Sequence, residues 1–150
     1  MDLVAGTHGR GIYKMNILPI QQAFKKGTPQ SDILFETPVA RLPWINDTHR
    51  EPKYSSLERV PITFYHMKEA EVEIRVNDEK GKTVWSRTLI GKQGFNQFRW
   101  DLVIKKVDSP RPYFIHYFMF VKAGVYGLRV TGEGVDLKGK LTVIDRKSKE

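Results

Sequence analysis

Two stretches in which apolar and polar residues alternate constrain the fold of this chain more than any other feature of its sequence. In residues 94–102, the apolar side chains on one strand face are Phe98, Trp100 and Leu102. After a glycine at position 124, the same alternation returns with Tyr126, Leu128 and Val130. Two such strands, facing each other, form the centre of a β-sandwich core in which Trp100 is the largest side chain.

The composition fits a single domain. The chain has 150 residues, of which 40% are hydrophobic. A chain of this length can bury enough apolar surface for one core, with a short tail to spare. It contains no cysteine, so disulfides, thiolate metal sites and cysteine nucleophiles are excluded.

The charge of the chain is basic but scattered. The formal net charge is +8, and the densest basic group is the terminal tail, residues 146–150. Phosphate binding requires a clustered basic stripe, so we expect no nucleic-acid partner. No apolar run approaches the roughly 18 residues of a membrane helix, so we expect no membrane span. The first residues lack the features of a signal peptide and indicate a start inside a longer protein.

The first 60 residues predict a hairpin, a short helix and a connector. Residues 3–15 are typical of strand, glycine turn and strand, and a lone hairpin is marginal in water, so it should belong to a larger sheet. Residues 18–27 carry helix signals, with a proline in the first turn and a glycine past the end. The expected buried stripe of this helix is Ile20, Ala23 and Phe24. Prolines punctuate residues 28–59, which we expect to form an extended connector.

From residue 61 the pattern predicts strands throughout. Alternating apolar residues mark strands at 62–66, 72–76, 83–90 and 137–144, besides the two described above. Residues 103–122 interrupt the pattern as an irregular insertion. Short strands at this spacing are typical of an immunoglobulin-like antiparallel β-sandwich, so we expect an all-β fold.

Two motifs, in the same order, resemble those of one family. Residues 2–13, Asp-Leu-Val-Ala-Gly-Thr-His-Gly-Arg-Gly-Ile-Tyr, resemble the end of the last propeller blade in bacterial sortilin-like proteins with BNR or Asp-box repeats, often labelled glycosyl hydrolases. The pattern Gly-x-Asn-x-Phe-x-Trp-Asp-Leu at 94–102, with Gly-x-Tyr at 124–126, is similar to their FlgD-like C-terminal immunoglobulin module. Ala123 stands where that module usually has proline before the glycine.

This resemblance implies an organisation and a role. It implies a propeller remnant at 1–16, a short helix and extended connector at 17–60, the immunoglobulin-like sandwich at 61–145 and a basic tail at 146–150. The implied role is a non-catalytic accessory domain, in structural support or docking, whose partner is the propeller of the same parent chain. The implied location is periplasmic or secreted. The Asp-box pattern Ser-x-Asp-x-Gly-x-Thr-Trp does not occur in the chain, so no catalytic residue is carried over.

Glu71 and Glu73 are the carboxylate pair that a glycoside hydrolase would require. They lie two apart on one strand face, hence roughly 7 Å apart, which an inverting mechanism permits. Arg75 continues the same face, and nothing nearby in the sequence predicts a pocket that would raise one pKa. The four histidines lack a metal-ligand spacing. We therefore expect no catalytic residue, no cofactor and no metal.

Carbohydrate binding is the alternative function. Sandwich domains can present exposed aromatic rings as platforms for sugars, and the candidate contacts here are Trp44, Trp85 and Tyr113. Trp85 lies on the opposite strand face from Val84, so we expect only one of the two to be buried. Loss of sugar affinity in Trp85→Ala would favour this function, and a flat titration against a glycan panel would favour the structural role.

Residues 113–120 are the candidate docking surface. Apart from a histidine, this run of tyrosine, phenylalanine, isoleucine and methionine carries no group that can be charged at neutral pH, and each exposed large side chain forgoes roughly 1.5–3 kcal/mol of burial. A sandwich buries one face of such a strand. The helix near Phe24 and the connector around Trp44, or the parent propeller, would cover the other face. Otherwise we expect self-association through this run or through the hairpin. The expected contacts are Tyr113, Phe114, Tyr117, Phe118 and Phe120.

Overall fold

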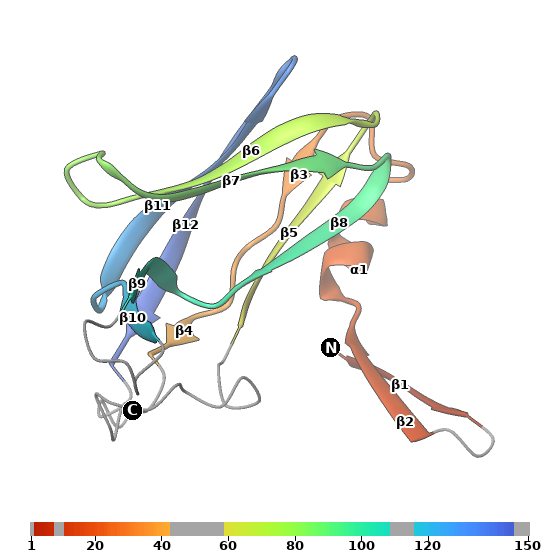
Figure 1. The fold of residues 1–150 in the computed structure, drawn as a ribbon. Coiled ribbons are helices and arrows are strands. Elements are labelled where there is room, and N and C mark those ends of the chain that lie inside the picture. Colours follow the sequence, from red (N-terminus) through yellow and green to blue (C-terminus); the bar gives the residue numbers. More distant parts are fainter. Residues whose placement is uncertain (1, 8–10, 43–58, 109–115, 146–150) are drawn as a thin grey trace.

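Two β-sheets packed face to face form most of the structure (Figure 1). The computed structural model describes residues 2–7, 11–42, 59–108 and 116–145. The larger sheet contains β4 (Ala40–Arg41), β12 (Val135–Ile144), β11 (Gly124–Gly132), β6 (Ala70–Asn77) and β7 (Thr83–Gly91), in that spatial order. The smaller sheet contains β3 (Ile33–Leu34), β5 (Val60–His66) and β8 (Gly94–Trp100). The expected all-β sandwich is therefore confirmed.

The core lies between the two sheets and follows the alternation in the sequence. Inward positions of β5, β6 and β11 are buried at every second residue: Ile62, Phe64, Val72, Ile74, Val76, Tyr126, Leu128 and Val130. Trp100, at the end of β8, is the largest fully buried side chain, as the sequence predicts. Its indole N–H donates to the carbonyl oxygen of Val103 at 3.1 Å, so the ring is buried without an unpaired donor.

A tyrosine at the start of β11 strengthens the immunoglobulin-like description. The hydroxyl of Tyr126 donates to the backbone carbonyl of Lys122, four residues upstream, at 2.8 Å. Such a tyrosine corner is a hallmark of immunoglobulin-like sandwiches. Burial raises the pKa of Tyr126 above its ordinary value, so the hydroxyl stays protonated and can donate this hydrogen bond.

The connector expected at residues 28–59 contributes strands to both sheets. Ile33 and Leu34 of β3 pair with β5, and β4 pairs in parallel with the end of β12. Phe35 and Ala40 are buried. Strand pairing within the sandwich therefore starts at β3, well before the expected residue 61. Pro38, which lacks an N–H, separates two strands of two residues each, and such short edge pieces carry no alternation that a sequence pattern could reveal.

The irregular insertion expected at 103–122 contains a β-hairpin. β9 (Val103–Asp108) and β10 (His116–Phe120) pair antiparallel, with a bulge between Met119 and Phe120. The hairpin leaves β8 through Leu102, a fully buried residue with a left-handed φ of 65°. The amide of Val121 donates to the Leu102 carbonyl at 3.0 Å and closes the base of the hairpin. Asp101 accepts the amide of Val103 at 3.1 Å, the turn-bonding role that its position at a strand end predicts.

The N-terminal segment forms a separate hairpin followed by one helix. β1 (Asp2–Thr7) and β2 (Gly11–Asn16) pair only with each other among the described residues, and α1 (Leu18–Phe24) follows them. Gly27, just past the helix, has the expected positive φ, 98°. The expected buried stripe is wrong at two of its three positions, because Ala23 is buried while Ile20 and Phe24 are exposed. A seven-residue helix beside a narrow three-stranded sheet has too little surface opposite it to bury a full stripe.

Candidate functional site

The outer face of the smaller sheet carries the first candidate site. Cross-strand pairs of β5 and β8 alternate along it: Tyr65 with Phe95, Thr63 with Gln97, and Pro61 with Arg99. The residues between them point into the core, as Ile62 and Phe64 show. This face thus has an aromatic end and a polar end.

Helix α1 covers the aromatic end. The ring of Phe24 lies edge-on to Tyr65 at 6.4 Å and 6.1 Å from Phe95, while Phe35 stacks on Phe95 at 5.7 Å. Phe24 and Phe95 remain 44% and 38% exposed. In Figure 1, α1 lies beside β5 and β8, away from the β9–β10 hairpin. The described contacts of Phe24 are therefore made on the smaller sheet.

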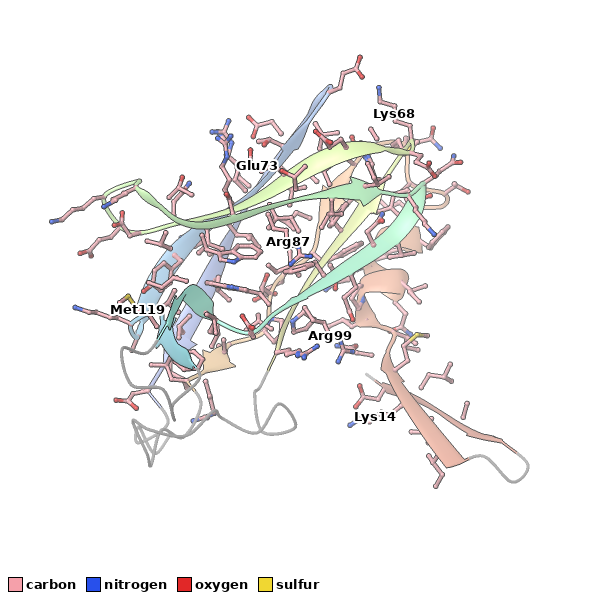
Figure 2. All side chains as sticks on the ribbon, viewed as in Figure 1. Lys14, Lys68, Glu73, Arg87, Arg99 and Met119 are labelled. Atoms are coloured by element: carbon pink, nitrogen blue, oxygen red, sulfur yellow. The ribbon has the colours of Figure 1, made fainter. Side chains whose placement is uncertain are left out.

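A second aromatic cluster bridges the edge strands β7 and β8 of the two sheets. The ring of Trp85 stacks on Phe98 at 5.5 Å and lies 4.9 Å from Trp100. The guanidinium carbon of Arg87 lies 5.4 Å from the Phe98 ring centroid, and Figure 2 shows Arg87 between the two strands. Trp85 is thus half-buried and packed against the core, which leaves only part of its surface for a sugar.

The side chains of Val84 and Trp85 do not divide into one buried and one exposed. Both side chains are half-buried and both pack against the core. The pairing of β6 and β7 shifts register here, because Val76 pairs with Trp85 while Asn77 pairs with Thr83. Val84 is the extra residue of this bulge, and an extra residue breaks the strict alternation of faces.

The other predicted contacts are described in part. Trp44, Tyr113 and Phe114 lie outside the described residues, and for Tyr117 and Phe118 the structure describes only their places in β10. Phe120 is half-buried and packs against the core, whereas Met119 is 51% exposed and labelled in Figure 2. The docking role of this run remains a prediction.

The carboxylates on β6 face a shallow, open depression. Glu71, Glu73 and Glu133 line it together with Thr88 and Thr131. Arg75 donates to Glu73 at 2.5 Å, and this hydrogen bond holds the pKa of Glu73 below its ordinary value. A general acid needs a raised pKa, so Glu73 is poorly suited to protonate a leaving group.

The buried His66 pairs with Asp32, and the sequence pattern does not predict this pairing. The Nδ1–H of His66 donates to Asp32 Oδ1 at 2.7 Å, and the amide of Met67 donates to the same oxygen at 2.8 Å. Burial raises the pKa of Asp32, but these hydrogen bonds, together with the nearby basic side chains of His66 and Lys68, lower it overall. His66 is 1% exposed, and its Nε2 has no partner among the described residues. The alternation predicts that His66 points inward, but its partner lies 34 residues upstream.

No group of three or more potential ligands in the described part of the chain is arranged to hold a metal ion. Within the same part, no helix is long and apolar enough to cross a membrane. A scan against protein-family models and a search of curated protein sequences found no match to this chain.

Proposed function

We propose that this chain is a non-catalytic accessory domain at the C-terminal end of a larger, propeller-containing, sortilin-like protein, and that it serves structural support and domain docking. The observation that carries the proposal is the β1–β2 hairpin, which pairs with no third strand among the described residues. Its exposed apolar side chains are Leu3 (51%), Val4 (60%), Ile12 (78%) and Met15 (50%).

The exposed residues lie on both faces of the hairpin. Leu3 pairs with Met15 on one face, and the next pair along, Val4 with Lys14, lies on the other, as does Ile12. A strand pair that is apolar on both faces, with unpaired edges, is marginal in water. Such a pair becomes stable as part of a larger sheet, and a four-stranded propeller blade is one sheet that would accommodate it.

The test of this proposal is amide hydrogen exchange on two forms of the protein. In the chain alone, amides of β1 and β2 should exchange much faster than those of β11, which is paired on both sides. In a chain extended upstream by its own coding sequence, the hairpin amides should become protected. A hairpin that is already protected in the isolated monomer, or an upstream sequence without Asp-box repeats, contradicts the proposal.

A second measurement concerns catalysis. We expect the purified chain to hydrolyse no aryl glycoside, because the carboxylate that faces Arg75 is held in its ionised form and the depression beside it is open. Turnover of any aryl glycoside that disappears in Glu73→Gln but persists in Glu69→Gln, an exposed control, would overturn the non-catalytic role.

The aromatic run at 113–120 is the proposed docking contact. The exposed Met119 supports this role, since it extends the run onto the surface beside β9. Replacing Phe114 and Phe118 with serine should weaken association with the propeller, or self-association of the isolated chain. Unchanged stability and unchanged association would remove the run from the interface.

A further inference from the structure

The larger sheet ends in one long edge strand, β7. It pairs with β6 on one side, and among the described residues no strand pairs with its other side. The opposite edge of this sheet is β4, which has two residues, whereas β7 has nine. An edge strand directs part of its backbone N–H and C=O groups away from the sheet. β7 therefore presents donors and acceptors to any strand that lies beside it.

The sequence of β7 lacks the side chains that usually keep edge strands apart. Natural edges are protected by lysine, other charged residues, proline or bulges. Between Thr83 and Gly91 there is no lysine, aspartate, glutamate or proline. The one charged residue is Arg87, whose guanidinium lies over the Phe98 ring. The bulge at Val84 affects only the first end of the strand, because residues 86–91 pair with β6 without a register shift.

The regular part of β7 has side chains that suit a further strand. Ser86, Thr88 and Ile90 lie on the outer face of the sheet, opposite residues of β6 that also point outward. All three are exposed, and Ile90 is 59% exposed. Threonine and isoleucine are β-branched and favour strands. A free backbone edge with these side chains is complementary to another β-strand.

A second copy of β7 fits this edge because of its symmetry. Two identical strands related by a two-fold axis run antiparallel, and both bring an unpaired edge of the same length. With the axis at Thr88, this residue lies opposite its own counterpart, and threonine pairs across strands are stabilising. Ile90 then lies opposite Ser86, and Arg87 opposite Leu89. An axis at Arg87 would instead bring two like charges together, which is destabilising.

We propose that this chain forms a dimer in which β7 pairs antiparallel with β7 of a second copy, about a two-fold axis at Thr88. The two larger sheets join into one continuous sheet. This interface is distinct from the β1–β2 hairpin and from residues 113–120. It goes beyond the accessory role and does not depend on it, because β7 belongs to the sandwich itself.

Analytical ultracentrifugation of the full chain tests the association. Moderate salt is required, because it screens the repulsion between two copies that each carry a net charge of +8. Thr88→Lys places two lysines opposite each other and should weaken the dimer about tenfold or more. Gln22→Lys adds the same charge at an exposed position of α1 and should leave the dimer intact. A chain that is monomeric up to about 1 mM, or equal dimerisation of the two variants, overturns the proposal.

Single cysteines test the register of the pairing. The chain contains no cysteine, so an introduced thiol reports on its own contact with the second copy. Thr88→Cys should form an intermolecular disulfide on mild oxidation, because the two thiols lie opposite each other. Ser86→Cys, on the same face, should not, since its counterpart lies four residues away along the strand. That separation is roughly 13 Å, beyond the Cα distance of about 7 Å that a disulfide permits.

The outcomes of the cysteine experiment are decisive in both directions. A disulfide in Thr88→Cys but not in Ser86→Cys supports the pairing about Thr88. Equal cross-linking of the two variants, or none in either, contradicts it. The serine variant of Phe114 and Phe118 provides a further comparison. If that variant abolishes the dimer while Thr88→Lys leaves it intact, the interface lies at residues 113–120 and the proposal fails.

Discussion

Trp100 is the residue on which most of the core depends. Its ring contacts Trp85 of β7, the edge strand of the other sheet, and its indole N–H donates to the carbonyl oxygen of Val103. Its burial and its hydrogen bond arise together at the end of β8, where the chain turns through Asp101 and the left-handed Leu102. A single indole therefore links both sheets and the start of the β9–β10 hairpin.

Truncating this residue should be severely destabilising. Trp100→Ala removes the largest fully buried side chain and is expected to lower the free energy of unfolding by about 3–5 kcal/mol. Urea denaturation followed by circular dichroism measures the change. Ile90→Ala, at a residue that is 59% exposed, is the control and should stay within about 0.5 kcal/mol. An unchanged free energy of unfolding in Trp100→Ala would contradict the core described here.

The Asp32–His66 pair should make stability depend on pH. The pKa of Asp32 is lower in the folded chain than its ordinary value. Its stabilising contribution is therefore present above the unfolded pKa, about 3.9, and is lost as the pH falls through the folded value. At pH 7, Asp32→Ala should cost about 1–3 kcal/mol, because it leaves the Nδ1–H of the buried His66 unpaired.

Comparing unfolding of the two proteins across pH checks this expectation. The difference in stability between the unaltered chain and Asp32→Ala should shrink as the pH is lowered from 6 to below the usual pKa of aspartate, about 4. Glu69→Ala, which removes an exposed carboxylate on the turn before β6, is the matched control. A stability difference that is the same at every pH would show that the ionised carboxylate of Asp32 contributes nothing.

At the scale of elements, neighbouring atoms lie too close to leave room for a side chain at two glycines, Gly132 in β11 and Gly139 in β12. A Cβ at Gly132 would lie 2.7 Å from the backbone oxygen of Glu71 on β6. A Cβ at Gly139 would lie 2.9 Å from the Leu34 side chain, whose end comes from β3 in the other sheet. A backbone oxygen in a paired strand cannot move without disturbing the sheet, whereas the end of a leucine side chain can rotate.

Alanine substitutions should separate these two cases. Gly132→Ala is expected to cost about 1–3 kcal/mol through overpacking against β6. Gly139→Ala should cost less, because Leu34 can adjust. Gly127→Ala provides the control on the same strand as Gly132, since its nearest contact would be at 3.9 Å. Thermal unfolding ranks the three variants, and equal melting temperatures for Gly132→Ala and Gly127→Ala would contradict the clash.

At the scale of the whole molecule, the short strands β3 and β4 tie the segment before residue 43 into the sandwich. β3 pairs with β5 in the smaller sheet and β4 pairs with β12 in the larger one. Leu34 packs against the core, and Asp32 precedes β3 to reach His66. The cooperative unit should therefore include residues 32–42, which precede the alternating strands that begin with β5.

Two truncations test this boundary. A chain beginning at Thr28 keeps β3, β4 and Asp32, so it should unfold in one cooperative transition with a modest loss of stability from the missing Phe24 cover. A chain beginning at Arg59 loses both short strands and leaves His66 without Asp32, so it should be much less stable or insoluble. Equal melting temperatures would place the boundary at residue 60 after all.

What the sequence alone determined is local. Period-two alternation identified the inward faces of β5, β6, β8 and β11 and the burial of Trp100, because neighbouring side chains on a strand point to opposite faces regardless of what they meet. Proline and glycine signals placed the helix and its end at Gly27 for the same reason, since backbone preference is a property of the residue itself.

What only the tertiary structure decided depends on pairs that are distant along the chain. The two-residue strands β3 and β4 exist because β5 and β12 offer unpaired edges, and the partner of His66 comes from 34 residues away. Trp85 is half-buried because a register shift against β6 undoes the alternation of β7. The register and packing of two paired segments depend on the free energy of contacts between them. A single stretch of sequence contains only one of the two segments, so it cannot determine either.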